Sequence, residues 1–151
     1  MEFILFLSKI DKEIVELINK SNNSIEENTA LCLIDKKFVG FYKRREKTIV
    51  ICTENAKKLG GFRTDHRNDN NKTHLYIRRA LRHEATHLVQ SCNKGKPTGI
   101  IKDIENKLQI TKLKALNSSM QISGNREKEI EAYVLEDKPR KVREILKTYC
   151  L

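Results

Sequence analysis

The sequence has no C-x-x-C pair among its four cysteines, which are Cys32, Cys52, Cys92 and Cys150. This absence argues against a cysteine zinc ribbon and against a thioredoxin-type redox motif. Cys32 and Cys52 lie in apolar runs, so we expect them to be buried, inert thiols. The spacing of Cys92 and Cys150 leaves open whether these two would pair in an oxidising compartment.

The chain also lacks an export signal and a long apolar run. Its first residues, MEFILFL, are only briefly apolar and follow no basic segment, so they match neither a signal peptide nor a membrane span. We expect them to form a buried first strand or the start of a helix. These absences predict a cytoplasmic protein with reduced thiols and no membrane partner.

A third absence is that of any nucleic-acid-binding pattern, despite a net charge of +10. A basic balance can attract nucleic acid, but RNP-type, helix-turn-helix and zinc-finger patterns are missing, as are internal repeats. The basic residues are scattered apart from clusters at 42–47 and 139–143. A nucleic-acid partner is therefore not favoured. The length of 151 residues and the 38% apolar content are typical of one globular domain spanning 1–151.

The first half of the chain predicts a helix followed by a small antiparallel sheet. Apolar residues recur at helical spacing over 9–19, and the polar run 20–29 is typical of a loop. Short β-branched or aromatic segments, separated by charged turns, predict strands over 30–34, 37–42 and 47–52. The sheet would end in a hairpin.

The second half is predicted to be helical. The expected order is a long loop over 53–72, a helix from the N-cap Thr73 to about Ser91, a helical outline over 98–116, a loop over 118–125, a helix from Arg126 to Asp137 and a last helix from Pro139. A small sheet packed against such a helical half is an α+β domain.

The segment HEATH, residues 83–87, contains two of the four histidines. Positions i and i+4 of an α-helix lie one turn apart on the same face, so His83 and His87 can direct imidazole nitrogens at one point. Zinc binds such nitrogens at about 2.0–2.1 Å. Glu84 is rotated by roughly 100° from His83, which suits a general base acting on water at the metal better than a third ligand.

Residues around this motif form two stripes on the predicted helix. One contains Tyr76, Ala80, His83 and His87, and the other contains Ile77, Leu81, Ala85 and Leu88. The apolar stripe can pack on a core while the first stripe faces a cleft. The alternative is a solvated helix on which the two histidines fall by coincidence.

Catalytic zinc needs three protein ligands and one open position. The extended pattern H-E-x-x-H-x-x-G-x-x-H is absent, because Gln90 and Asn93 replace its glycine and its last histidine. Downstream, the segment EIEAY, residues 129–133, resembles the gluzincins, zinc metallopeptidases in which a glutamate from a second helix joins H-E-x-x-H. The chain looks most like their minimal single-domain members, including immunity-type and phage-related peptidases. This resemblance covers 83–136, roughly a third of the chain.

The resemblance implies one Zn²⁺ per chain with Glu129 as the third ligand, and Glu131 is the alternative ligand. Ala132 would be the small residue that lets the two helices approach closely. Tyr133 stands where many relatives carry Asp or Asn to orient a histidine ligand. Its hydroxyl could take over that role, stabilise the transition state, or only pack.

The function implied is zinc-dependent hydrolysis of a peptide or protein substrate, with Glu84 as the general base and zinc polarising the carbonyl. The strand TIVIC would be either the edge strand beside the cleft or an ordinary core strand. Candidates for stabilising the oxyanion are Tyr76, Tyr133, His66 and His74.

Two other classes of function are weighed against this one. The first is a catalytically inactive, metal-binding interaction module, which would keep its biological effect after Glu84→Gln. The second is a basic nucleic-acid-binding protein with an incidental H-E-x-x-H, whose affinity would fall steeply with salt. No feature of the sequence predicts an oligomeric state.

Overall fold

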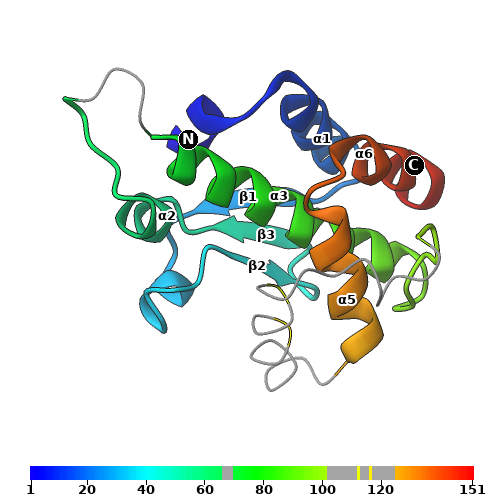
Figure 1. Ribbon diagram of the computed structural model, residues 1–151. Coiled ribbons are helices and arrows are strands. Elements are labelled where there is room, and N and C mark those ends of the chain that lie inside the picture. Colours follow the sequence, from blue (N-terminus) through cyan, green and yellow to red (C-terminus); the bar gives the residue numbers. More distant parts are fainter. Residues whose placement is uncertain (66–69, 102–111, 113–115, 117–124) are drawn as a thin grey trace.

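The computed structural model describes residues 1–65, 70–101, 112, 116 and 125–151. The elements are η1 (Glu2–Phe6), α1 (Lys9–Lys20), β1 (Ser24–Glu27), η2 (Ala30–Leu33), β2 (Gly40–Lys43), β3 (Thr48–Ile51), α2 (Thr53–Leu59), α3 (Asn71–Cys92), α5 (Arg126–Leu135) and α6 (Pro139–Cys150). Helices predominate in this part of the chain and pack against one small sheet (Figure 1). The predicted α+β class is confirmed.

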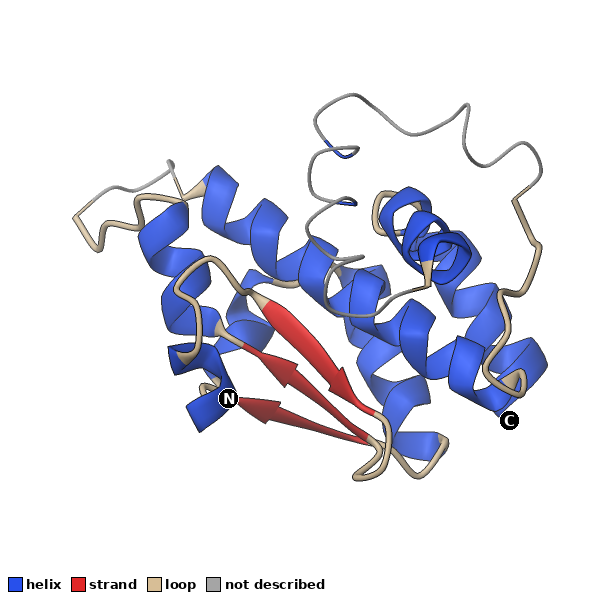
Figure 2. Ribbon diagram, turned by 90° about the horizontal axis from the view of Figure 1, so that it is seen from below, coloured by secondary structure: helices blue, strands red, loops and turns tan. Residues whose placement is uncertain are grey.

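The sheet is mixed rather than wholly antiparallel. β3 lies between its two partners, with β1 parallel to it and β2 antiparallel. Side chains alternate along β3, so Ile49 and Ile51 join the main core while Val50 packs on the opposite face against Cys32 and Cys52. Figure 2 shows the three strands side by side, with the long helices gathered on one side of them.

α3 is the central element, in contact with the sheet and with α1, α2, α5 and α6. Its stripe of Ile77, Leu81, Ala85 and Leu88 is completely buried, as predicted. Full burial of each large aliphatic side chain contributes about 1.5–3 kcal/mol. This packing fixes the rotation of α3, and the neighbouring stripe is thereby held toward α5 and β2. The helix begins at Asn71, so Thr73 lies inside its first turn rather than at the N-cap.

Three predictions between residues 20 and 72 are wrong. The expected loop over 20–29 contains β1, whose sequence SIEE has Ile25 as its one apolar residue and so shows no repeated apolar–polar alternation. The expected strand over 30–34 is the short 3₁₀ helix η2, and the expected loop over 53–72 contains α2. The other two expected strands correspond to β2, which begins three residues later than predicted, and to β3.

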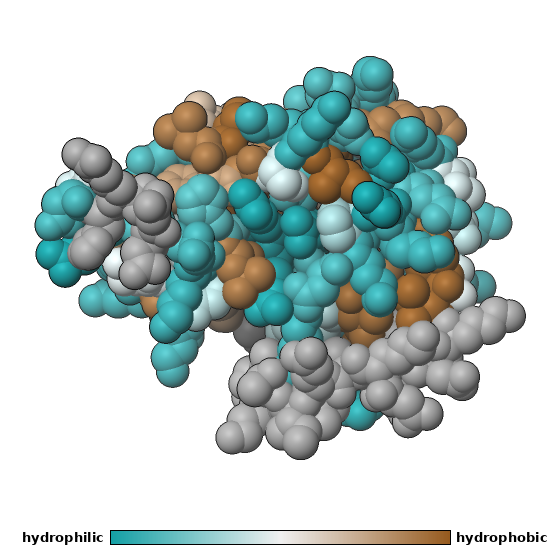
Figure 3. Space-filling view, turned by 45° about the horizontal axis from the view of Figure 1, so that its top comes forward, coloured by the Kyte–Doolittle hydropathy of each residue, from teal (hydrophilic) through white to brown (hydrophobic). Residues whose placement is uncertain are grey.

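The helical half agrees more closely with prediction. α1, α5 and α6 match the expected helices to within two residues at each end. The expected helical outline over 98–116 lies largely outside the described residues, and the loop expected over 118–125 lies almost wholly outside them. No described helix is long and apolar enough to cross a membrane. On the face drawn in Figure 3, hydrophobic residues form separate groups among hydrophilic ones.

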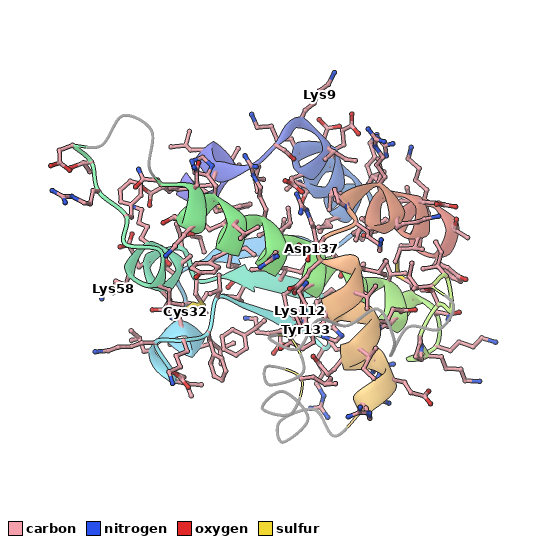
Figure 4. The ribbon with its side chains drawn as sticks, in the orientation of Figure 1. Lys9, Cys32, Lys58, Lys112, Tyr133 and Asp137 are labelled. Atoms are coloured by element: carbon pink, nitrogen blue, oxygen red, sulfur yellow. A yellow bond between two sulfur atoms is a disulfide. The ribbon has the colours of Figure 1, made fainter. Side chains whose placement is uncertain are left out.

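The cysteines form two disulfides, Cys32–Cys52 and Cys92–Cys150. The expectation of inert thiols at Cys32 and Cys52 is therefore wrong, because η2 brings Cys32 against the end of β3, with 5.5 Å between the Cα atoms (Figure 4). The second disulfide ties the end of α3 to the end of α6 across 58 residues. Closing a loop of that length stabilises a fold by roughly 4 kcal/mol in the chain-entropy description.

Candidate metal centre

The two histidines of HEATH and Glu129 lie together where α3 crosses α5. His83 Nε2 is 3.3 Å from one carboxylate oxygen of Glu129, and His87 Nε2 is 3.0 Å from the other. Both imidazoles lie on the same face of α3, as the i, i+4 spacing predicts. Ala132, the small residue of α5 that was expected to let the two helices approach closely, is completely buried.

The cluster has the dimensions of a metal site. One ligand atom from each of His83, His87 and Glu129 can be chosen so that all three lie within 4.8 Å of one another. Ligands of a tetrahedral zinc with bonds of about 2.0–2.1 Å are about 3.3 Å apart, so small side-chain adjustments would suffice. The His83–His87–Glu129 cluster could therefore hold a metal ion.

Each imidazole is oriented through its second ring nitrogen. His83 Nδ1 is 3.1 Å from Glu136 Oε2, and His87 Nδ1 is 2.9 Å from Gln90 Oε1. When Nδ1 donates its proton to such an acceptor, the Nε2 lone pair is left for a metal. Neither partner was predicted from the sequence, although both have helical spacing: Gln90 follows His87 by one turn, and Glu136 follows Glu129 by two.

The hydrogen-bond partners of Glu131 differ from those of Glu129. Its carboxylate accepts hydrogen bonds from the backbone N–H groups of Thr98 and Gly99, from the Thr98 hydroxyl and from Gln90 Nε2, at 2.9–3.0 Å. Glu131 therefore fastens the segment after α3 onto α5. Of the two candidates for the third ligand, the structure brings only Glu129 to the histidines.

The charges of the cluster are strongly coupled in the metal-free protein. Burial alone would lower the pKa of His83, but its hydrogen bonds with Glu129 and Glu136 outweigh burial and raise that pKa to about 10. Burial alone would raise the pKa of Glu129, but hydrogen bonds from His83 and His87 hold it well below its ordinary value. In the metal-free state, the protonated His83 side chain thus supplies part of the positive charge that a metal ion would bring to Glu129.

Glu84 lies next to this cluster without belonging to it. Its side chain is buried, and burial raises the pKa of its carboxyl above the ordinary value. Gly40 of β2 passes directly beside it, because a Cβ at that position would lie 3.0 Å from Glu84 Cγ and 3.3 Å from Ala80 Cβ. The missing side chain of Gly40 thus lets the strand backbone approach Glu84 closely.

The remaining predicted site residues are dispersed. The Tyr133 ring lies 4.5 Å from that of His83, measured between centroids, and Tyr76 lines the cleft farther along α3. His74 lies elsewhere, with Nδ1 3.2 Å from the Phe6 carbonyl oxygen. His66 lies outside the described residues. Glu136 lies at Nδ1 of His83, and the roles considered for the Tyr133 hydroxyl stay predictions.

Two basic side chains hold Glu136 in place. Lys112 Nζ lies 2.9 Å from Glu136 Oε1 and 2.6 Å from Asp137, and Figure 4 shows Lys112, Tyr133 and Asp137 together beside α5. Arg82 donates to the Glu136 carbonyl oxygen while its guanidinium makes a two-pronged ion pair with the buried Asp11. This buried pair links α1, α3 and the end of α5 behind the His83–His87–Glu129 cluster.

The cluster lies at a cleft of about 800 Å³. One wall comes from β2 and the residues on either side of it, and the other from α3, α5 and Lys112. β2 is an edge strand of the sheet, whereas β3 is paired on both sides and completely buried. The alternative that made TIVIC the edge strand is therefore wrong: TIVIC is the central strand, and GFYK borders the cleft.

Comparison with known proteins gives a family but no activity. The family described as "Domain of unknown function (DUF8637)" matches residues 3–151. These residues include all three members of the His83, His87 and Glu129 cluster. No curated protein and no solved structure is significantly similar to this chain. Because the match covers nearly the whole sequence, the chain belongs to the DUF8637 family of domains of unknown function.

Proposed function

We propose that this protein is a zinc-dependent peptidase in which His83, His87 and Glu129 hold the metal and Glu84 is the general base. The observation that carries the proposal is the convergence of both imidazole Nε2 atoms on one carboxylate at the cleft. The Nδ1 atom of each imidazole already has a partner, which supports the tautomer that a metal requires. Glu84 lines the same cleft and is not one of the three residues of the cluster.

The donor set favours zinc over other metals. Two imidazole nitrogens and one carboxylate are typical of catalytic zinc, whereas magnesium and calcium prefer oxygen ligands alone. Zinc held by three such ligands lowers the pKa of a coordinated water to about 7 and polarises a carbonyl. We expect one zinc ion per chain, since a single cluster of this kind occurs in the part of the chain that the structure describes.

Glu84 would move the proton. It would take a proton from the attacking water and deliver it to the leaving amine, so its carboxylate is used twice in one turnover. Burial keeps the group away from bulk solvent, and in the metal-free protein it raises the pKa of the Glu84 carboxyl. Tyr133, beside His83, is the side chain best placed to donate to the developing oxyanion, and Tyr76 is the next candidate.

The substrate would bind along β2. No strand of the described residues pairs with the outer edge of β2, so its free backbone groups could accept an extended peptide as a fourth strand. The close approach of Gly40 to Glu84 would bring the scissile bond near the general base. This mode of binding requires an unfolded or exposed segment in the target protein.

The two disulfides bear on the cellular compartment of the protein. A cytoplasmic location was predicted together with reduced thiols, and the two disulfides remove that ground because disulfides persist in oxidising compartments. We propose an oxidising environment instead. Alkylation of the freshly isolated protein without reductant, followed by intact-mass measurement, should find no free thiol. Four alkylated cysteines would restore the cytoplasmic prediction.

The first test of function is the zinc content of protein purified without added metal or tag histidines. We expect one zinc per chain in the native protein and in Glu84→Gln, and none in His83→Ala. Hydrolysis of a mixed peptide library, read by mass spectrometry, should then require both zinc and Glu84. Cleavage that survives Glu84→Gln would come from a contaminant or a different mechanism.

The same variants separate the rival classes. An interaction module would bind zinc and retain its biological effect in Glu84→Gln. A nucleic-acid-binding protein would bind oligonucleotides with an affinity that falls steeply with salt and does not depend on zinc. The absence of zinc, with none taken up on titration, would remove the peptidase proposal altogether.

A further inference from the structure

The charges that line the cleft are unevenly distributed. Among the described residues, the basic side chains that line it are Lys37, Arg44, Arg79, Lys112 and Lys128. The acidic ones are Glu84, Glu129 and Glu136, and all three belong to the proposed metal centre or its support. Among the residues that the structure describes, the negative groups are therefore concentrated at the proposed reacting position, and the charged groups of the surrounding walls are positive.

Three of these cations have no acidic partner among the described residues. Arg79 and Lys112 pair with Asp137, and Lys112 also pairs with Glu136. Lys37, Arg44 and Lys128 form no ion pair with any residue that the structure describes. Lys37 and Arg44 are exposed and Lys128 is half-buried, so all three can meet a ligand in the cleft.

The three cations surround the free edge of the sheet. Lys37 precedes β2 by three residues, Arg44 follows it directly, and Lys128 lies in the first turn of α5 on the opposite wall. A substrate stretch paired with the four residues of β2 would span about 13 Å at the usual rise per residue. Residues beyond either end of that stretch would then lie near Lys37 or Arg44.

On the basis of the proposed peptidase function, we infer that the cleft takes acidic peptides: segments with an uncharged centre and Asp or Glu on both sides of the scissile bond. Lys37, Arg44 and Lys128 would bind the flanking carboxylates. The centre would lie between Val39 and Tyr42 on one wall and Tyr76 on the other, which pack at the edge of the main core. The basic walls raise the local concentration of such peptides as well as their affinity.

An acidic peptide fits this distribution better than a nucleic acid does. A nucleic acid carries a negative charge at every nucleotide and would place a phosphate beside the carboxylate of Glu84, which lies outside the proposed metal cluster. A peptide can instead place its charges at the two ends and a neutral bond at the centre. The Glu84 carboxylate at the centre of the cleft, with positive side chains on both sides of it, therefore matches a polymer with a neutral centre and negative charges at its ends.

The test uses short synthetic peptides with a randomised centre and flanks that are all Glu, all Gln or all Lys. Zinc-loaded protein is given each set, and cleavage is read by mass spectrometry against Glu84→Gln as the background. Binding of the same sets to zinc-loaded Glu84→Gln is measured separately by fluorescence anisotropy. The second readout reports recognition without requiring hydrolysis.

The charge-reversal variant is Lys37→Glu with Arg44→Glu. Its matched control is Lys12→Glu with Lys20→Glu, which makes the same change in net charge at exposed positions of α1 that do not line the cleft. We expect the Glu-flanked set to be cleaved and bound about tenfold better than the Lys-flanked set, with this preference reversed in the cleft variant and retained in the control. Raising the salt concentration should weaken the preference.

The outcomes separate this inference from the proposed function. Cleavage or binding that is equal for all three flanks overturns the acidic preference while the peptidase proposal stands. Preferential binding of the Glu-flanked set with no cleavage retains the recognition and overturns the peptidase proposal. Tighter binding of an oligothymidine than of the Glu-flanked set overturns the inference in favour of nucleic acid.

Discussion

Two sides of α5 carry buried glutamates that do different things. Glu129 is 6% exposed and faces α3, where two imidazoles hold its carboxylate. Glu131 is 1% exposed and faces the segment after α3, where backbone N–H groups, a hydroxyl and an amide hold its carboxylate. The two residues have the same side chain, lie on one helix and are separated by a single position.

The two carboxylates differ in whether their hydrogen-bond partners could become metal ligands. An imidazole can give up a proton and turn its lone pair to a metal, so the partners of Glu129 can become fellow ligands. A backbone N–H has no lone pair to offer, so the partners of Glu131 can only remain donors. Burial and charge alone thus fail to distinguish a ligand from an anchor, and the chemistry of the partners decides.

The largest effect should come from Glu129→Ala. Removing a ligand should reduce zinc affinity by more than the roughly 10–100-fold that is typical when an outer partner is lost. The purified variant should contain no zinc while it keeps the circular dichroism spectrum of the native protein. One zinc per chain in Glu129→Ala, with none in Glu131→Ala, would exchange the roles of the two residues.

Glu131→Ala should instead lower the free energy of unfolding, by roughly 2–4 kcal/mol, because several partly buried donors lose their acceptor. Urea denaturation of the zinc-free protein measures this loss. Glu131→Gln, which keeps one carbonyl oxygen as an acceptor, should lose less. Zinc content should remain at one per chain in both variants, and an unchanged unfolding midpoint in Glu131→Ala would show that the carboxylate is not an anchor.

The contrast also marks what could be predicted from the sequence. The stripes of α3 and the limits of α5 and α6 follow from helical spacing, whereas the choice of Glu129 over Glu131 came from the resemblance of EIEAY to the gluzincins; both rest on local patterns. Gln90 and Glu136 have the same helical spacing, so both could have been predicted as partners of the histidines. β3 was recognised as a strand, and its four consecutive buried residues are typical of a central strand rather than an edge.

Other features depend on partners distant in the sequence. The strand β1 was missed because its polar Glu27 is satisfied by the backbone N–H groups of Glu2 and Phe3 and by the Thr53 hydroxyl. The Cys32–Cys52 disulfide likewise depends on η2 meeting the end of β3. No local pattern reveals such contacts, because they follow from tertiary packing.

Substitution of Glu136 should have an intermediate effect on the metal centre. Glu136→Ala removes the acceptor of His83 Nδ1, so zinc affinity should fall by roughly 10–100-fold while zinc still binds. Competition with a chelator of known affinity measures the change. Glu127→Gln is the matched control, since Glu127 lies exposed on the same helix, and it should leave the affinity unchanged.

The pH dependence tests the exchange between proton and metal at Glu129. The pKa of His83 in the metal-free protein is raised from 6.5 to about 10, so its ion pair contributes stability that is complete below pH 6.5 and lost as pH rises toward 10. Zinc must displace the same proton, so zinc affinity should rise about tenfold per pH unit within this window. Chelator competition at several pH values measures the slope.

Two variants sharpen the interpretation of that slope. Glu131→Gln should leave it unchanged, because Glu131 does not contact His83. Glu136→Gln should make it level off at a lower pH, because one of the two carboxylates that raise the pKa of His83 is neutralised. A zinc affinity that does not change with pH would contradict a proton on His83. If the slope is found, a rise in pH weakens the His83–Glu129 ion pair of the metal-free protein and raises the zinc affinity at the same time. The N–H and O–H donors around Glu131 cannot produce this coupling, because none of them loses a proton in this pH range.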